Sequence, residues 1–160
     1  MNKLRIIAVL LAVSSFSQAS YYAEWGAGFQ HPSSEPVSDR MKFVEFGYTE
    51  EHKLFDVSYA LGGWNDASGI PGVRNSAYVK TLLRLETRTL GIYMGYAFGP
   101  AFLFEPDILL GSHFELAHEI EIGFKDTRVV SVSIVVQHLS DGGLSQHNYG
   151  RNFIGPKVRF

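Results

Sequence analysis

The sequence predicts an all-β fold, an eight-stranded antiparallel transmembrane β-barrel. Eight segments of about ten to fifteen residues alternate apolar side chains with small or polar ones, and turn-forming residues separate them. After the N-terminal segment there is no run of about 18 apolar residues, so membrane-spanning helices are excluded. The chain contains no cysteine, which excludes disulfides, zinc–thiolate sites and thiol nucleophiles.

The N-terminal segment is predicted to be a secretory signal peptide. Two cations precede an apolar run over residues 6–13, and the small residues Ser17 and Ala19 stand in the spacing that signal peptidase reads. That run is too short to span a bilayer as a helix. The predicted organisation is therefore a signal peptide at 1–19 and one outer-membrane β-barrel at 20–160.

The first four strands are predicted at 21–30, 42–49, 54–62 and 77–86. In each segment one of the two alternating sets of residues is mainly apolar, which is typical of a strand with one apolar face. The apolar stripes are Tyr21, Ala23, Trp25, Ala27 and Phe29 in the first segment, Val44, Phe46 and Tyr48 in the second, Phe55, Val57, Tyr59 and Leu61 in the third, and Val79, Leu83 and Leu85 in the fourth. The tryptophans Trp25 and Trp64 are interpreted as parts of interfacial aromatic belts.

The last four strands are predicted at 90–104, 110–124, 128–140 and 152–160. They are longer than the five or six residues usual in soluble proteins, which favours a membrane barrel. The chain also ends on Phe160, and a terminal aromatic residue resembles the assembly signal of bacterial outer-membrane proteins. The apolar stripes are Leu90, Ile92, Met94, Tyr96, Phe98, Phe102 and Phe104; Phe114, Leu116, Ile120, Ile122 and Phe124; Val130, Val132, Ile134 and Val136; and Ile154, Val158 and Phe160.

The opposite face of these strands carries small residues and charges of both signs. In a small closed barrel this face lines the interior, where the charges are expected to neutralise one another. In a soluble sandwich the same face would be exposed. The acidic residues are Glu24, Glu45, Glu115, Glu119 and Glu121, and the basic ones are Lys80, Arg84, Lys157 and Arg159.

Charge and histidine positions limit the possible partners. Without the predicted signal peptide, 12 of the 14 basic residues remain against 16 acidic ones, so nucleic acid is not expected as a partner.

His113 and His118 lie near three glutamates, but their opposite parity prevents both from pointing into the barrel without a bulge. We expect no metal and no cofactor. His118 falls on the apolar face, which a bulge or a shifted register would explain.

The lengths of the connections predict the orientation of the barrel. Barrels of this kind have short periplasmic turns and longer outer loops, so the strand that ends at Ser140 is expected to run toward the outer leaflet. The short connections are 51–53, 87–89 and 125–127, and the long ones are 31–41, 63–76 and 141–151.

Two polar residues, His138 and Ser140, continue the apolar stripe of the seventh segment. They lie two residues apart on one side of the strand, about 6.6 Å between Cα atoms at roughly 3.3 Å per residue. A histidine at this distance can take the hydroxyl proton, as serine acyl transfer requires. The alternative is that both side chains simply lie in the wet interface above the hydrocarbon.

The motif residues resemble those of a known family. His138-Leu139-Ser140, Gly143-Leu144 and Asn148-x-Gly150 resemble the His-x-Ser-Asn-x-Gly and Asn-x-Gly motifs of the PagL family, the lipid A 3-O-deacylases of the outer membrane. The element from Gly99 to Phe102 and the eight-strand layout extend the resemblance more loosely. It implies that Ser140 is the nucleophile and His138 the base, on the outside of the barrel.

Two residues depart from the family pattern. The family has a glutamate twelve residues beyond the serine to orient the histidine, and this chain has Asn152. Asn152 shares the outward parity of its strand, so it is expected to meet His138 across the hairpin and to orient the imidazole by accepting a hydrogen bond. Asp141 replaces the usual asparagine after Ser140, so an oxyanion hole has to rely on backbone N–H groups of Asp141, Gly142 or Gly143. Asn148 and Gly150 are expected to support the site from the last loop.

The function predicted from the resemblance is serine-esterase hydrolysis of the 3-O-linked acyl chain of lipid A, with lipopolysaccharide in the bacterial outer membrane as the partner. Two alternatives stay open: an outer-membrane phospholipase-type esterase and a non-catalytic structural or binding barrel. The oligomeric state also stays open, with a homodimer as one alternative.

Overall fold

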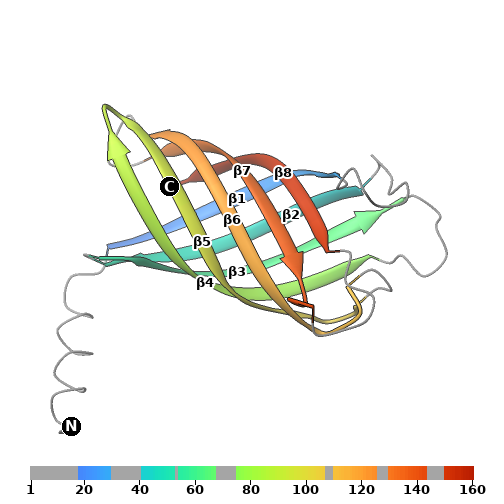
Figure 1. Cartoon of the computed structure of the whole chain (residues 1–160). Helices are drawn as coiled ribbons and strands as arrows, with labels where there is room; N and C mark the ends of the chain where they lie inside the picture. Colours follow the sequence, from blue (N-terminus) through green and yellow to red (C-terminus); the bar gives the residue numbers. More distant parts are fainter. Residues whose placement is uncertain are drawn as a thin grey trace, which may run out of the picture.

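The computed structural model describes residues 18–29, 41–52, 54–67, 75–106, 110–125, 130–143 and 150–160. Over these residues eight antiparallel strands form one closed barrel in sequence order, which confirms the predicted fold class. Each strand pairs with its neighbours in sequence, and β8 closes the barrel against β1 (Figure 1). The strands are β1 (Gln18–Phe29), β2 (Met41–Glu51), β3 (Asp56–Asp66), β4 (Ser76–Thr89), β5 (Ile92–Leu103), β6 (Phe114–Lys125), β7 (Ser131–Ser140) and β8 (Arg151–Arg159).

The strand boundaries explain one wrong prediction. The turn expected at 87–89 is instead formed by Leu90 and Gly91, because β4 continues through Thr89. Both turn residues have positive φ, 52° and 80°, as a two-residue turn needs in order to match the right-handed twist of its strands. Residues 1–17 lie outside the described part of the chain, so most of the predicted signal peptide does too, and it stays a prediction.

The apolar stripes face outward around the barrel. Phe46 is 62% exposed and Ile120 is 59% exposed, whereas the neighbouring Glu45 and Glu119 are buried inside. Trp25 also faces outward. None of the described residues form a helix long and apolar enough to span a membrane.

One end of the barrel interior is filled by apolar side chains. Trp64 belongs to this cluster and is 4% exposed, so its assignment to an interfacial belt is wrong. Its even position on β3 points it inward, and its ring packs against Tyr78 and Phe153. The cluster consists of Met41, Phe43, Trp64, Tyr78, Leu82, Ala97, Ala101, Leu103, Leu110, Ala117, Leu139 and Phe153.

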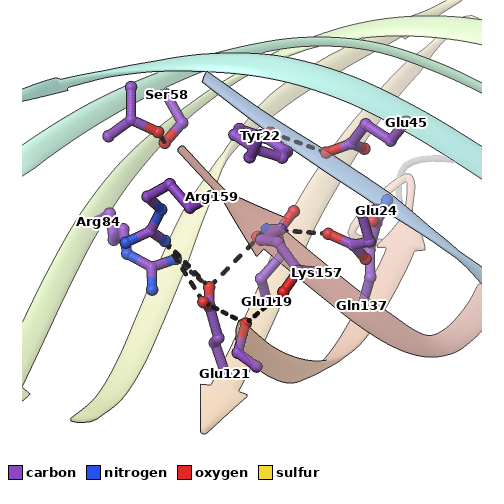
Figure 2. A network of polar contacts seen from close by, with 12 residues as sticks. Tyr22, Glu24, Glu45, Ser58, Arg84, Glu119, Glu121, Gln137, Lys157 and Arg159 are labelled. Carbon is purple, nitrogen blue, oxygen red and sulfur yellow. Dashed lines mark hydrogen bonds and ion pairs between the residues drawn. The ribbon is translucent and has the colours of Figure 1, made fainter. Parts of the chain in front are cut away.

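The rest of the interior is held by ion pairs, as the sequence predicts. The Lys157 ammonium lies 2.9 Å from a carboxylate oxygen of Glu24 and 2.9 Å from one of Glu119. Arg84 and Arg159 both contact Glu121 (Figure 2). Buried charges of opposite sign are therefore paired across β1, β4, β6 and β8, and these side chains fill this part of the barrel interior.

Removing Lys157 is expected to destabilise the barrel. Lys157→Met leaves three buried carboxylates without this cation, and breaking such a buried pair costs about 3–5 kcal/mol. Urea titration in detergent micelles, with the folded fraction read from heat-modifiable gel migration, measures the loss in free energy of unfolding. The matched control is Lys42→Met, since Lys42 is exposed on the outer face of β2. Equal unfolding midpoints for the two variants would contradict the expected role of the ion pairs.

Candidate active site

The two polar residues of the seventh stripe lie on the outer wall, near one end of the barrel. β7 runs from Ser131 to Ser140 and ends at the barrel end opposite the Leu90–Gly91 turn (Figure 1). This is also the end at which the long connections begin and finish. His138 and Ser140 are both half-buried, whereas Val132 and Ile134, earlier on the same face, are exposed.

Asn152 meets His138 directly across the β7–β8 hairpin. The two residues are register partners, and the His138 Nδ1 and Asn152 Oδ1 atoms are 2.8 Å apart. An amide oxygen only accepts hydrogen bonds, so this contact places the imidazole proton on Nδ1. In the neutral ring, Nε2 is therefore the nitrogen that is able to accept a proton.

Gly150 lies against the edge of the His138 ring opposite Asn152. A Cβ atom at Gly150 would lie 2.6 Å from His138 Cε1 and 3.3 Å from Nε2, closer than ordinary contact allows. Its φ of +67° also disfavours other residues. Glycine at this position therefore lets the backbone before β8 pass against the Nε2 edge of the ring.

Ser140 is on the same face of β7 as His138, and within the described part of the chain no hydrogen bond links the two side chains. Catalytic hydrogen bonds are often long or misaligned without substrate and tighten when it binds. The arrangement places a hydroxyl on the same face of β7 as an oriented imidazole, two residues along the strand.

The residues after Ser140 form a tight turn at the barrel rim. The Asp141 carboxylate is buried and accepts a hydrogen bond of 2.8 Å from the Gly143 N–H. Gly142 and Gly143 both have positive φ, 68° and 86°. Because the Gly143 N–H already donates to Asp141, the oxyanion-hole proposal concentrates on the amides of Asp141 and Gly142. Asn148 lies outside the described residues.

Two neighbours of this site did not emerge from the sequence. His118 on β6 is the register partner of His138, and the two rings are 6.5 Å apart between centroids. Tyr96 on β5 lies beside it, with its hydroxyl 2.8 Å from His118 Nδ1. The pairing of β6 with both neighbouring strands runs through His118 in unbroken register, so the bulge or shifted register considered for it is not needed.

In the sequence, the position of His118 on the outward face of its strand is the feature that points to a place near His138. It shares the outward face with His138, and in a hairpin with a short connection two such residues can become partners. Which residues pair depends on the register, and alternation alone does not predict it.

One group of carboxylates lies inside the barrel, away from this site. Oxygens of Glu24, Glu45 and Glu119 lie within 4.8 Å of one another. Lys80 contacts Glu45 at 2.6 Å and also pairs with Glu119, while Lys157 contacts Glu24 and Glu119. Each of these three carboxylates therefore already contacts at least one of the two ammonium groups.

Comparison with known proteins identifies relatives of the chain. The family model described as lipid A 3-O-deacylase (PagL) matches residues 44–160. This match covers the strands that carry the site and both partners of the His138–Asn152 contact. No curated protein matches the sequence.

Solved structures share the fold at low sequence identity. The crystal structure of Neisserial surface protein A is 11% identical with a TM-score of 0.66, and it covers 91% of this chain and 98% of its own. The crystal structure of the outer membrane enzyme PagL is 16% identical with a TM-score of 0.65, covering 88% and 98%. Ail, the attachment invasion locus protein of Yersinia pestis, is 10% identical with a TM-score of 0.51, covering 90% and 97%. These similarities show the barrel fold.

Proposed function

Because the chain belongs to the lipid A 3-O-deacylase (PagL) family, we propose that this outer-membrane β-barrel hydrolyses the ester that links an acyl chain to the 3-O position of lipid A. One observation supports the assignment of this reaction to Ser140 and His138. On the outer wall of the barrel, His138 is held by Asn152, and Ser140 follows two residues later on the same face of β7. Polar side chains on such a wall cost free energy, which is consistent with a function there.

The proposed chemistry begins with attack by Ser140. Its oxygen adds to the ester carbonyl carbon as His138 Nε2 takes the hydroxyl proton. The tetrahedral intermediate then expels the sugar oxygen, which receives that proton from His138, and the acyl group remains on Ser140. Water then attacks the acyl-enzyme carbonyl as His138 takes a proton from it; the bond to the Ser140 oxygen breaks, that oxygen receives the proton, and the fatty acid is released.

The position of the site suits a substrate that stays in the membrane. Ser140 lies at the end of β7, where the apolar stripe reaches the barrel rim, and Asp141 and Gly142 follow directly. Their backbone N–H groups are the proposed donors to the oxyanion. A lipid that diffuses in the outer leaflet reaches an outward-facing site laterally, with its acyl chains along the barrel wall.

Asn152 sets a limit on the expected rate. It fixes the imidazole tautomer by accepting from Nδ1–H, but it supplies no negative charge to stabilise the imidazolium formed during attack. We therefore propose that the chain deacylates lipid A more slowly than a homologue with glutamate in this position.

Mass spectrometry of lipid A tests the function directly. Cells that express the full chain are expected to contain lipid A lighter by one acyl group than cells without it, and the purified protein is expected to release the matching fatty acid from lipid A in detergent micelles. Release only from glycerophospholipids would instead identify a phospholipase-type esterase. If neither lipid is hydrolysed, a non-catalytic barrel becomes the better account.

A further inference from the structure

His113 lies at the rim of the barrel, just before β6, and two contacts fix its imidazole ring. Nδ1 is 2.7 Å from the backbone oxygen of Leu103, and the ring stacks on that of Phe102, with 5.6 Å between the centroids and 16° between the planes. A carbonyl oxygen only accepts hydrogen bonds, so Nδ1 carries the proton that is donated to Leu103. Nε2 of the neutral ring is then an acceptor, and none of the described residues hydrogen-bonds to it.

Exposed phenylalanine rings form a cluster with this imidazole on the outer wall. Phe102 on β5 and Phe114 on β6 are register partners, and their rings meet edge to face with 5.8 Å between centroids. Phe104 meets Phe102 in the same way at 6.1 Å, and all three side chains are exposed. The mechanism proposed above uses neither His113 nor these rings.

The strand register places this cluster on the rim side of the candidate active site. Ser140 on β7 pairs with Leu116 on β6, and Phe114 lies two residues nearer the rim. At about 4.8 Å between strands and 3.3 Å per residue, the Cα atoms of Ser140 and Phe114 are roughly 8 Å apart. The cluster is therefore within the span of two linked sugar rings from the nucleophile.

The other side of the site is occupied by the chain itself. The backbone at Gly150, just before β8, lies against the His138 ring. The β5–β6 side instead presents the exposed rings of Phe102 and Phe114. The headgroup of a lipid whose ester carbonyl lies at Ser140 therefore has its available protein surface on the β5–β6 side.

We propose that His113, Phe102, Phe104 and Phe114 form a headgroup subsite that binds a sugar ring of the lipid substrate. Nε2 of His113 accepts a hydrogen bond from a sugar hydroxyl. The phenylalanine rings pack against the C–H face of the sugar, because the faces of aromatic rings are partly negative and attract its partly positive hydrogens. This inference rests on the proposed function and adds a second region of contact with the same substrate.

A sugar ring fits the cluster better than the other parts of a lipid. A hydrocarbon chain offers no donor to Nε2, and a phosphate offers no C–H face to the exposed rings. A sugar offers both groups, and it lies on the headgroup side of the ester, which is also the side of Ser140 on which the cluster lies.

Two substrates test the inference with the full protein in detergent micelles: lipid A, and the methyl ester of the same acyl chain, which lacks the sugar. In His113→Asn the value of kcat/KM for lipid A is expected to fall about fivefold, the size expected of one neutral hydrogen bond, and mainly through KM. The value for the methyl ester is expected to stay as in the wild type. Asparagine is chosen because its amide nitrogen can replace Nδ1 as donor to Leu103, so only Nε2 is lost.

Further variants separate binding from structure. Phe114→Leu is expected to lower kcat/KM for lipid A alone, and His113→Gln, whose amide reaches the position of Nε2, is expected to retain part of the wild-type value. His52→Asn is the matched control, since His52 lies between β2 and β3 at the opposite end of the barrel. Heat-modifiable gel migration confirms that each variant is folded, and if His113→Asn does not fold, the other two carry the test.

The outcomes distinguish the two proposals. If the wild type hydrolyses neither substrate, the proposed function itself fails. If His113→Asn leaves kcat/KM for lipid A unchanged, lowers it only through kcat, or lowers the values for both substrates equally, the subsite is overturned while the deacylase proposal stands. If its effect on lipid A disappears once the phosphates are removed, the ligand is a phosphate and the sugar assignment is overturned.

Discussion

Ser140→Ala and His138→Ala are each expected to lower the rate of lipid A deacylation roughly 10³-fold or more, because each removes a member of one catalytic unit. The double variant is expected to be little slower than either single variant, since the unit is already lost after one change. Release of fatty acid from lipid A by the purified proteins, followed by mass spectrometry, measures all three rates.

Neither change is expected to disturb the fold. Both side chains lie on the outer wall rather than in the packed interior, so heat-modifiable migration should stay as in the wild type. Thr81→Ala is the matched control, because Thr81 is an exposed hydroxyl on β4, three strands from β7 in the barrel. Persistent fatty acid release from Ser140→Ala would rule out the serine mechanism.

Asn152→Leu is expected to lower deacylation about 100-fold, because it removes the acceptor that holds the proton on His138 Nδ1. Asn152→Glu is expected to match or exceed the wild-type rate, since a carboxylate both accepts that proton's hydrogen bond and stabilises the imidazolium. Rates at saturating lipid A isolate this effect from binding.

Asn65→Leu is the control for this pair, as Asn65 is an exposed asparagine on the outer face of β3. It should leave the rate unchanged. An Asn152→Leu protein that works at the wild-type rate would show that the contact with His138 does not serve the reaction.

Much of the fold follows from alternation along the chain. Because successive side chains of a strand point to opposite faces, Phe46 and Ile120 could be assigned outward and Glu45 and Glu119 inward before any strand was paired. The same logic placed His138 and Ser140 on the outer wall. Residue type favours an interfacial position for Trp64, but parity places it on the inward face that it shares with Ala60, and parity prevails.

Turn positions were predicted less well, for a local reason. The sequence from Thr87 to Thr89 suggested a turn, but Leu90 and Gly91 adopt the positive φ values that a tight hairpin needs. Leucine rarely adopts a positive φ, so residue preferences do not predict a turn at Leu90.

The sequence by itself determined the fold class, the two faces of each strand and the presence of a histidine and a serine on the lipid-facing side. The contact of His138 with Asn152 was expected from parity and from the resemblance. The tertiary structure alone decided the other pairs: Lys157 with Glu24 and Glu119 inside, and His118 between Tyr96 and His138 outside. The reason is that side-chain direction has a period of two and is a local property of the backbone. Register between strands depends instead on turn geometry and on closure of the whole barrel, which no single segment encodes.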